Sequence, residues 1–208
     1  MYRRVIAAAG LLAAMILAAP LHAQEGIEGK YVPIKPAQPT QTGDKIEVVE
    51  VFWYGCPHCY SFEPHLEEWL ENKPDDVAFI RIPGVLNQGW IPHAKAYYAA
   101  EKLGIVDKIH RPLFDAIHRE RRQLYTEDQL AEFFAGHGVP AGQFKSVFNS
   151  KEVDTKIRQA YFLARDYKLT GVPSLVINGK YLTSGTHAGS FESMLEVTDK
   201  LIEQERQE

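Results

Sequence analysis

The 208-residue chain contains only two cysteines, no internal repeat, no uncharged apolar run longer than 15 residues and no excess of basic residues. The short run excludes a multi-span membrane protein, because a membrane-spanning helix needs about 20 apolar residues. A formal charge of -4 without a basic cluster gives no reason to expect nucleic acid or an anionic membrane as a partner. The remaining composition, 45% hydrophobic and 24% charged, is that of a globular protein long enough to build its own core.

The first 23 residues have the pattern of an export signal. Arg3 and Arg4 form a positive head, the run from Val5 to Ala19 is apolar, and Ala23 is a small residue before a polar stretch. We predict a signal peptide over residues 1–23, cleaved after Ala23. If it is not cleaved, the segment becomes a tether and the protein faces the same compartment.

Export changes what the two cysteines mean. Exported chains use cysteines mainly as staples that close long loops, but Cys56 and Cys59 are three positions apart. A ring this small is expected to contribute about 2 kcal/mol by loop entropy, the low end of the range. A chain of this size has little need of that, so the pair is better explained by chemistry than by stability.

The residue pattern predicts two kinds of segment. Residues 24–43, with three prolines, read as an extended arm. A strand over 46–54, a helix from Cys56 to about Glu71 and a strand over 77–82 make a β-α-β unit, which indicates a parallel sheet. Residues 44–88 and 168–208 are expected to form one domain, interrupted by an all-helical insertion over 89–167. The expected helices of the insertion cover residues 94–103, 107–119, 126–135, 141–148 and 153–167.

The chain after the insertion returns to strand signals. Residues 174–177 and 180–182 flank Asn178-Gly179, the strongest short-range signal for a β-hairpin. Residues 191–205 are predicted to close the chain as a helix.

The segment Cys56-Pro57-His58-Cys59 places a thiol where its ionised form is favoured. Cys56 is expected at the start of a helix, where free N–H groups and the helix dipole stabilise a thiolate. His58 can add a positive charge, and Pro57 suits the first helical position. A pKa about four units below that of a free thiol would make the disulfide about 70 mV more oxidising.

Charged residues near this pair form a second candidate group. Glu50 lies in the otherwise apolar row of the first strand, six residues before Cys56. It either carries a proton for Cys59 from a buried position, or reaches solvent or pairs with Arg81 on the neighbouring strand. Glu63, seven positions after Cys56, faces the same way on the helix, although a single glutamate there is more often on the surface. Five scattered histidines are also expected on the surface: His65, His93, His110, His118 and His137.

These motifs together resemble the DsbA family of bacterial periplasmic thiol:disulfide oxidases, over nearly all of the chain from about Asp44. They are Glu50, Phe52, Cys56-Pro57-His58-Cys59-Tyr60, Gly171-Val172-Pro173 and Asn178-Gly179-Lys180-Tyr181. The resemblance implies an α/β thioredoxin fold, a central mixed sheet flanked by helices, with an inserted all-helical domain. It implies the periplasm as the location of a monomer that needs no cofactor and no metal.

The resemblance also implies roles for individual residues. Cys56 would be the exposed nucleophile, and the Cys56–Cys59 disulfide would pass to reduced, unfolded exported proteins through a mixed disulfide. Val172-Pro173 would be a cis-proline loop that binds the substrate backbone. Glu50, Glu63 and Arg81 would be the charged residues near the active site, although the third is commonly lysine. A quinone-linked protein of the inner membrane, similar to DsbB, would reoxidise the dithiol.

Three other functions remain open on the sequence. A reductant or isomerase of the same fold is one, although no dimerisation domain is present and Pro57-His58 favours oxidation. A metal-binding module using Cys56, His58 and Cys59 is another, but structural zinc needs a fourth ligand. The third is a peptide-binding chaperone in which the disulfide is incidental.

Overall fold

The computed structural model describes residues 26–207. The predicted signal peptide and its cleavage after Ala23 lie outside these residues. Within the described part of the chain, no helix is both long enough and apolar enough to cross a membrane.

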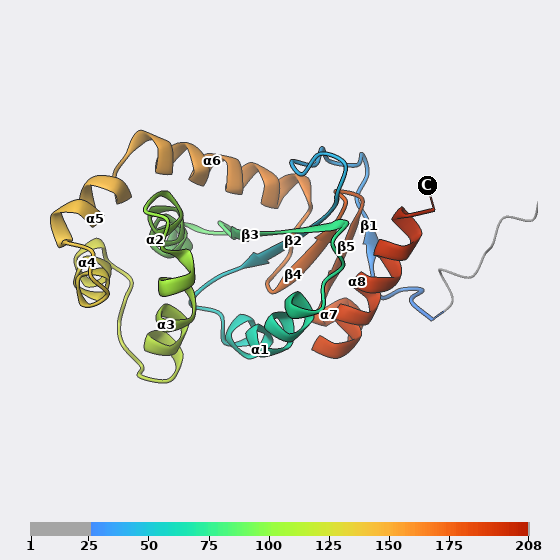
Figure 1. Cartoon of the computed structure of the whole chain (residues 1–208), viewed down its shortest axis with the longest axis horizontal. Helices are drawn as coiled ribbons and strands as arrows, with labels where there is room; N and C mark the ends of the chain where they lie inside the picture. Colours follow the sequence, from blue (N-terminus) through green and yellow to red (C-terminus); the bar gives the residue numbers. More distant parts are fainter. Residues whose placement is uncertain (1–25, 208) are drawn as a thin grey trace, which may run out of the picture.

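A five-stranded mixed sheet forms the centre of the molecule, in the order β1-β5-β4-β2-β3 (Figure 1). β2 (Ile46–Phe52) and β3 (Val77–Pro83) are parallel, with Glu50 opposite Arg81. β4 (Ser174–Ile177) and β5 (Tyr181–Ser184) form the predicted hairpin around Asn178-Gly179, and β4 pairs antiparallel with β2. β2 ends at Phe52, two residues earlier than predicted, because the chain turns there toward Cys56.

Helices cover both faces of this sheet. α1 (Pro57–Glu71) and α8 (Phe191–Glu205) pack on one face, where Phe62, Leu66 and Leu201 are fully buried with Val48. Figure 1 shows α6 (Lys151–Asp166) along the opposite side. Burying each large apolar side chain of this kind contributes about 1.5–3 kcal/mol.

The inserted segment is helical, as predicted. Between β3 and β4 the chain forms a 3-10 turn, Gln88–Trp90, and five helices. These are α2 (Ile91–Lys102), α3 (Val106–His118), α4 (Glu127–Gly136), α5 (Ala141–Phe148) and α6. Together with the sheet they make a thioredoxin fold with a helical insertion, which confirms the predicted fold class; the borders at residues 88, 89, 167 and 168 stay predictions.

The segment predicted as an extended arm is part of the fold. Its residues Val32–Pro33 form β1, which pairs antiparallel with β5 at the sheet edge. Ile27 and Ile34 on either side are buried. A strand of two residues has no hydrophobic periodicity, so no pattern along the chain predicts it. A four-residue helix, α7 (Gly185–Ala188), was likewise not predicted.

Candidate active site

The thiol of Cys56 lies at the amino end of α1. Cys56 is the N-cap residue and Pro57 occupies the first helical turn, as the sequence predicts. The Cys56 Sγ accepts a hydrogen bond from the Cys59 backbone N–H at 3.3 Å. The Cys56 Sγ also lies 3.5 Å from the carbonyl oxygen of Val172. The Cys56 thiol is therefore held between the helix end and the loop before β4. Cys56 is only 7% exposed, so the exposed position that the resemblance implies is wrong.

The two thiols have opposite acidities. The pKa of Cys56 falls from an ordinary value of 9.0 to about 6. The largest cause is a hydrogen bond from the Cys59 thiol, opposed by burial and assisted by the backbone N–H groups of Cys59 and His58 and by the His58 charge. Burial raises the pKa of Cys59, which is fully shielded from solvent. Cys56 is therefore the thiolate at neutral pH and Cys59 keeps its proton.

This result refines the electrostatics inferred from the sequence. The helix end and His58 do lower the Cys56 pKa, but the contribution of the Cys59 thiol is larger than either. The reduction, to about 6, is also smaller than the four units assumed above. The pKa of Cys56 is lowered, as expected, and the size of the change depends on a contact that forms only when the Cys56 and Cys59 side chains are packed together.

The Val172–Pro173 peptide bond is cis. Pro173 is buried, and the hydroxyl of Ser174 closes the loop by donating to the Gly171 carbonyl at 2.8 Å. The contact between Val172 and Cys56 brings residues 116 positions apart to the same point. The loop and the cysteine pair thus form one surface.

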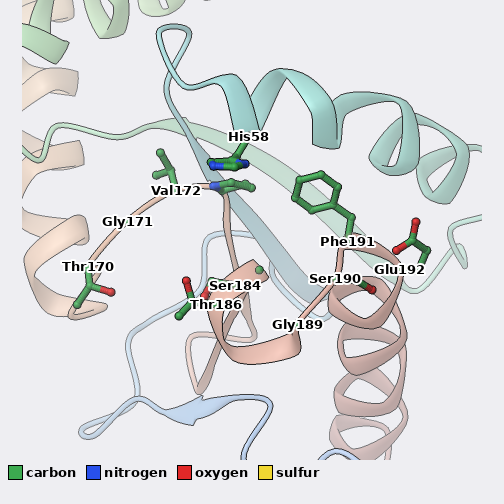
Figure 2. Close-up of a pocket in the computed structure, with 12 residues that line it drawn as sticks. His58, Thr170, Gly171, Val172, Ser184, Thr186, Gly189, Ser190, Phe191 and Glu192 are labelled. Carbon is green, nitrogen blue, oxygen red and sulfur yellow. The ribbon is translucent and has the colours of Figure 1, made fainter.

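A pocket of about 520 Å³ opens beside this surface (Figure 2). Its lining residues come from the start of α1, the loop before β4, and the segment around α7 and the start of α8. They are His58, Thr170–Pro173, Ser184–Thr186 and Gly189–Glu192. The wall combines the Phe191 ring with hydroxyl and backbone groups, which suits a peptide segment better than a purely apolar ligand.

A buried group of charges lies near the cysteine pair. Arg81 Nε donates to Glu50 Oε2 at 2.9 Å, and Arg81 Nη2 lies 3.4 Å from Glu63 Oε2. Both carboxylate side chains are 0% exposed. Burial and the nearby Glu63 charge raise the pKa of Glu50 to about 8, although Arg81 opposes the shift. Glu50 is buried and pairs with Arg81, so the expectation that it reaches solvent is wrong, and its role as a proton carrier for Cys59 stays a prediction.

Glu63 is not a surface residue. Burial acts to raise the pKa of its carboxyl, but His110 and Arg81 together lower it below the ordinary value. One arginine thus faces two carboxylates, and only Glu50 is shifted toward the neutral form. The site residues named from the sequence form two groups, one around Cys56 and one around Arg81.

Two histidines expected on the surface are buried instead. His93 and His110 are 1% and 6% exposed, His65 and His118 are half-buried, and only His137 is exposed. Sequence reasoning missed His110, which lies 3.3 Å from Glu63. A signal existed: helical spacing puts His110 on the same face as Leu113, Phe114 and Ile117 of α3.

Two stacked tryptophans lie at the loop that leads into Cys56. Trp53 and Trp90 stack with ring centroids 4.6 Å apart and an interplanar angle of 2°. Gly55 makes this possible, because a Cβ on it would lie 2.3 Å from the Trp53 ring. The missing side chain therefore shapes the loop that leads into Cys56.

Comparisons with known proteins agree with this geometry. Residues 86–195 match the family described as "DSBA-like thioredoxin domain". The chain is 40% identical to the thiol:disulfide interchange protein DsbA of Pseudomonas syringae pv. tomato, over 98% of this chain and 96% of that protein. It is 36% identical to the DsbA of Burkholderia cepacia, over 94% and 92%.

Solved structures show the same likeness. The crystal structure of Pseudomonas aeruginosa DsbA superposes with a TM-score of 0.82 at 41% identity, covering 86% of this chain and 93% of that one. DsbA of Xylella fastidiosa has a TM-score of 0.80 at 38% identity, covering 85% and 95%. With its paired cysteines at a helix end and this likeness over nearly its whole length, the chain belongs to the DsbA family of thiol:disulfide interchange proteins.

Proposed function

We propose that this protein is a thiol oxidase of the bacterial periplasm that donates its Cys56–Cys59 disulfide to reduced, unfolded exported proteins. The observation that carries the proposal is the unequal acidity of the two thiols. A thiolate that is stable in the reduced form makes the disulfide easier to reduce, and so a better oxidant.

The transfer proceeds in two exchanges. A substrate thiolate attacks the Sγ of Cys56, the Cys56–Cys59 bond breaks, and Cys59 leaves as a thiolate that takes up a proton. A second substrate thiolate then attacks the substrate sulfur of the mixed disulfide, and Cys56 leaves as a thiolate. Two electrons pass from substrate to protein, and the substrate gains one disulfide.

The surrounding residues have distinct roles in this scheme. Glu50, with its raised pKa, holds a proton near neutral pH and supplies it to the buried Cys59. Glu63 and Arg81 complete the charge balance around Glu50. His58 and Pro57 favour the Cys56 thiolate, and Val172-Pro173 with the adjoining pocket receives the substrate backbone.

The proposal includes the context of the reaction. The signal peptide over residues 1–23 directs the chain to the periplasm, where it works as a monomer. A quinone-linked protein of the inner membrane, similar to DsbB, takes the two electrons from the reduced dithiol. The mature protein would then begin at Gln24, and mass spectrometry of the exported chain tests this.

Equilibration of the mature protein with reduced and oxidised glutathione tests the direction of the reaction. After acid trapping, free thiols are counted, with the Cys56→Ser/Cys59→Ser protein as the blank. We expect the pair to be largely reduced even in oxidising buffer, which marks a strong oxidant. A pair that stays oxidised against excess reduced glutathione would assign the protein a reducing role and overturn the proposal.

A further inference from the structure

His110 is a buried titratable residue that the scheme above does not use. It belongs to α3 of the helical insertion, yet its imidazole reaches two residues of the thioredoxin part. The Nδ1 atom lies 2.9 Å from the hydroxyl oxygen of Tyr54, and Nε2 lies 3.3 Å from Glu63 Oε1. The side chains of His110 and Glu63 are 7% and 0% exposed.

The surroundings of His110 keep its imidazole neutral. Aromatic rings of Phe52, Tyr54 and Phe114 pack around it, with centroids 5.0, 5.3 and 5.2 Å away. Tyr97 of α2 lies farther off, at 6.2 Å. Burial lowers the pKa of His110, although Glu63 opposes the shift.

The remaining charges come from two other elements. Arg81 of β3 lowers the pKa of His110, and Glu67 of α1 acts weakly in the opposite sense. A neutral imidazole carries one N–H, so its two nitrogens must play different roles.

The neighbours of His110 decide which nitrogen carries the proton. When the Tyr54 hydroxyl donates to Nδ1, the N–H is on Nε2 and faces Glu63 Oε1. The other tautomer would set the Nε2 lone pair against a carboxylate oxygen. Within residues 26–207, neither Nε2 nor Glu63 Oε1 forms a well-aligned hydrogen bond, although the two buried atoms are 3.3 Å apart. Each is therefore available as the partner of the other.

The two carboxylates around Arg81 then differ in their donors. Glu63 has Arg81 at one oxygen and His110 Nε2 3.3 Å from the other, although that contact is not aligned as a hydrogen bond. Glu50 has Arg81 at Oε2, while within the described chain its buried Oε1 receives no hydrogen bond. A carboxyl oxygen without a donor is better tolerated when the group is neutral.

We propose that His110 is a positioning residue that acts through Glu63: its Nε2–H keeps Glu63 ionised and leaves the proton of the pair on Glu50. This inference rests on the proposed function in one respect: the proton held by Glu50 is the one that Cys59 would take up. It gives the helical insertion a part in the redox chemistry, because α3 supplies the group that distinguishes two otherwise similar carboxylates.

The test is a pH titration of the two carboxyl groups in the reduced full-length mature protein, by NMR of carbon-13-labelled glutamate. Glu50→Gln and Glu63→Gln proteins assign the two signals. We expect His110→Phe, which keeps the ring and removes both nitrogens, to raise the Glu63 titration by about one pKa unit or more. His110→Gln, whose side-chain amide can donate from nearly the position of Nε2, should recover at least half of that change.

Phe114→Leu is the packing control, because the Phe114 ring packs against the same imidazole and has no polar group to offer Glu63. It should leave the Glu63 titration unchanged. If His110→Phe does not fold, His110→Leu replaces it: this smaller apolar side chain also removes both nitrogens, and Glu63 should again titrate higher.

An unchanged Glu63 titration in a folded His110→Phe or His110→Leu protein would overturn the inference, and so would a shift equally large in Phe114→Leu. These outcomes are independent of oxidase activity. The glutathione equilibrium of the wild-type protein decides the proposed function separately.

Discussion

The Cys59 thiol is the largest influence on the acidity of Cys56, so removing it is the sharpest perturbation of the site. In Cys59→Ala the backbone N–H that donates to Cys56 Sγ at 3.3 Å remains, and only the S–H donor is lost. A hydrogen bond to a charged group contributes about 1.5–3 kcal/mol, and S–H is a weak donor, so we take the lower end. About 1.4 kcal/mol corresponds to one pKa unit.

The expected pKa of Cys56 is therefore about 6 in the wild-type reduced protein and about 7 in Cys59→Ala. At pH 7 the thiolate fraction falls from about nine tenths to about half. Ultraviolet absorbance of the thiolate measures the titration directly, and the rate of alkylation by iodoacetamide follows the same fraction. The matched variant is Cys59→Ser, whose hydroxyl is a stronger donor, and it should keep the pKa of Cys56 near or below the wild-type value.

Two outcomes of the Cys56 titrations would contradict this prediction. If Cys59→Ala titrates at the wild-type value, the helix end and His58 alone account for the low pKa. If Cys59→Ser and Cys59→Ala rise together, the buried volume matters and the donated hydrogen bond does not. Either result would refute the reasoning from the Cys59 thiol.

Three further predictions concern the Cys56–Cys59 redox couple, the stacked tryptophans and the helical insertion. The reduced form ionises at Cys56 only above pH 6. The reduction potential of the Cys56–Cys59 couple should therefore fall by about 59 mV per pH unit below pH 6 and by about 30 mV per pH unit from there to the Cys59 pKa. One constant slope from pH 5 to pH 8 would contradict this. The lowered pKa of Cys56 also stabilises the folded reduced protein. Relative to an unfolded thiol with a pKa of 9.0, the thiolate adds nothing to the free energy of unfolding below pH 6 and at most about 1.4 kcal/mol at pH 7. Its full contribution is reached only above pH 9. Gly55→Ala should push Trp53 off Trp90, cost about 1–3 kcal/mol in urea unfolding and change the tryptophan fluorescence; unchanged fluorescence and midpoint would argue against the close approach. Thr126→Ala removes the capping box at the start of α4 and should lower the free energy of unfolding by about 1 kcal/mol. Thr155→Ala, which removes a half-buried threonine inside α6 that caps no helix, should cost much less; equal losses would show that the cap is not the cause.

Local features of the chain could be predicted from the sequence alone. α5 and α8 have the predicted bounds, and the hairpin turns at Asn178-Gly179 as expected. The N-cap position of Cys56 and the proline after it follow from a four-residue motif. These features depend on backbone preferences and on neighbours within one or two helical turns, and both are written in consecutive residues.

The charged group around Arg81 required the tertiary structure. Glu50, Glu63, Arg81 and His110 come from four elements, β2, α1, β3 and α3. The sequence offers the Glu50–Arg81 pair as one possibility, but it favours a surface position for Glu63 and His110. The same holds for β1, whose two residues gain their meaning only by pairing with β5.

By itself, then, the sequence determined where the two cysteines lie, where the helix that holds them begins and which sheet supports it. Only the folded chain decided how acidic Cys56 is and which buried carboxyl holds a proton. The physical reason is that a pKa depends on desolvation and on charges within a few ångströms. Those neighbours, such as His110 beside Glu63, are brought together by packing between segments that lie far apart along the chain.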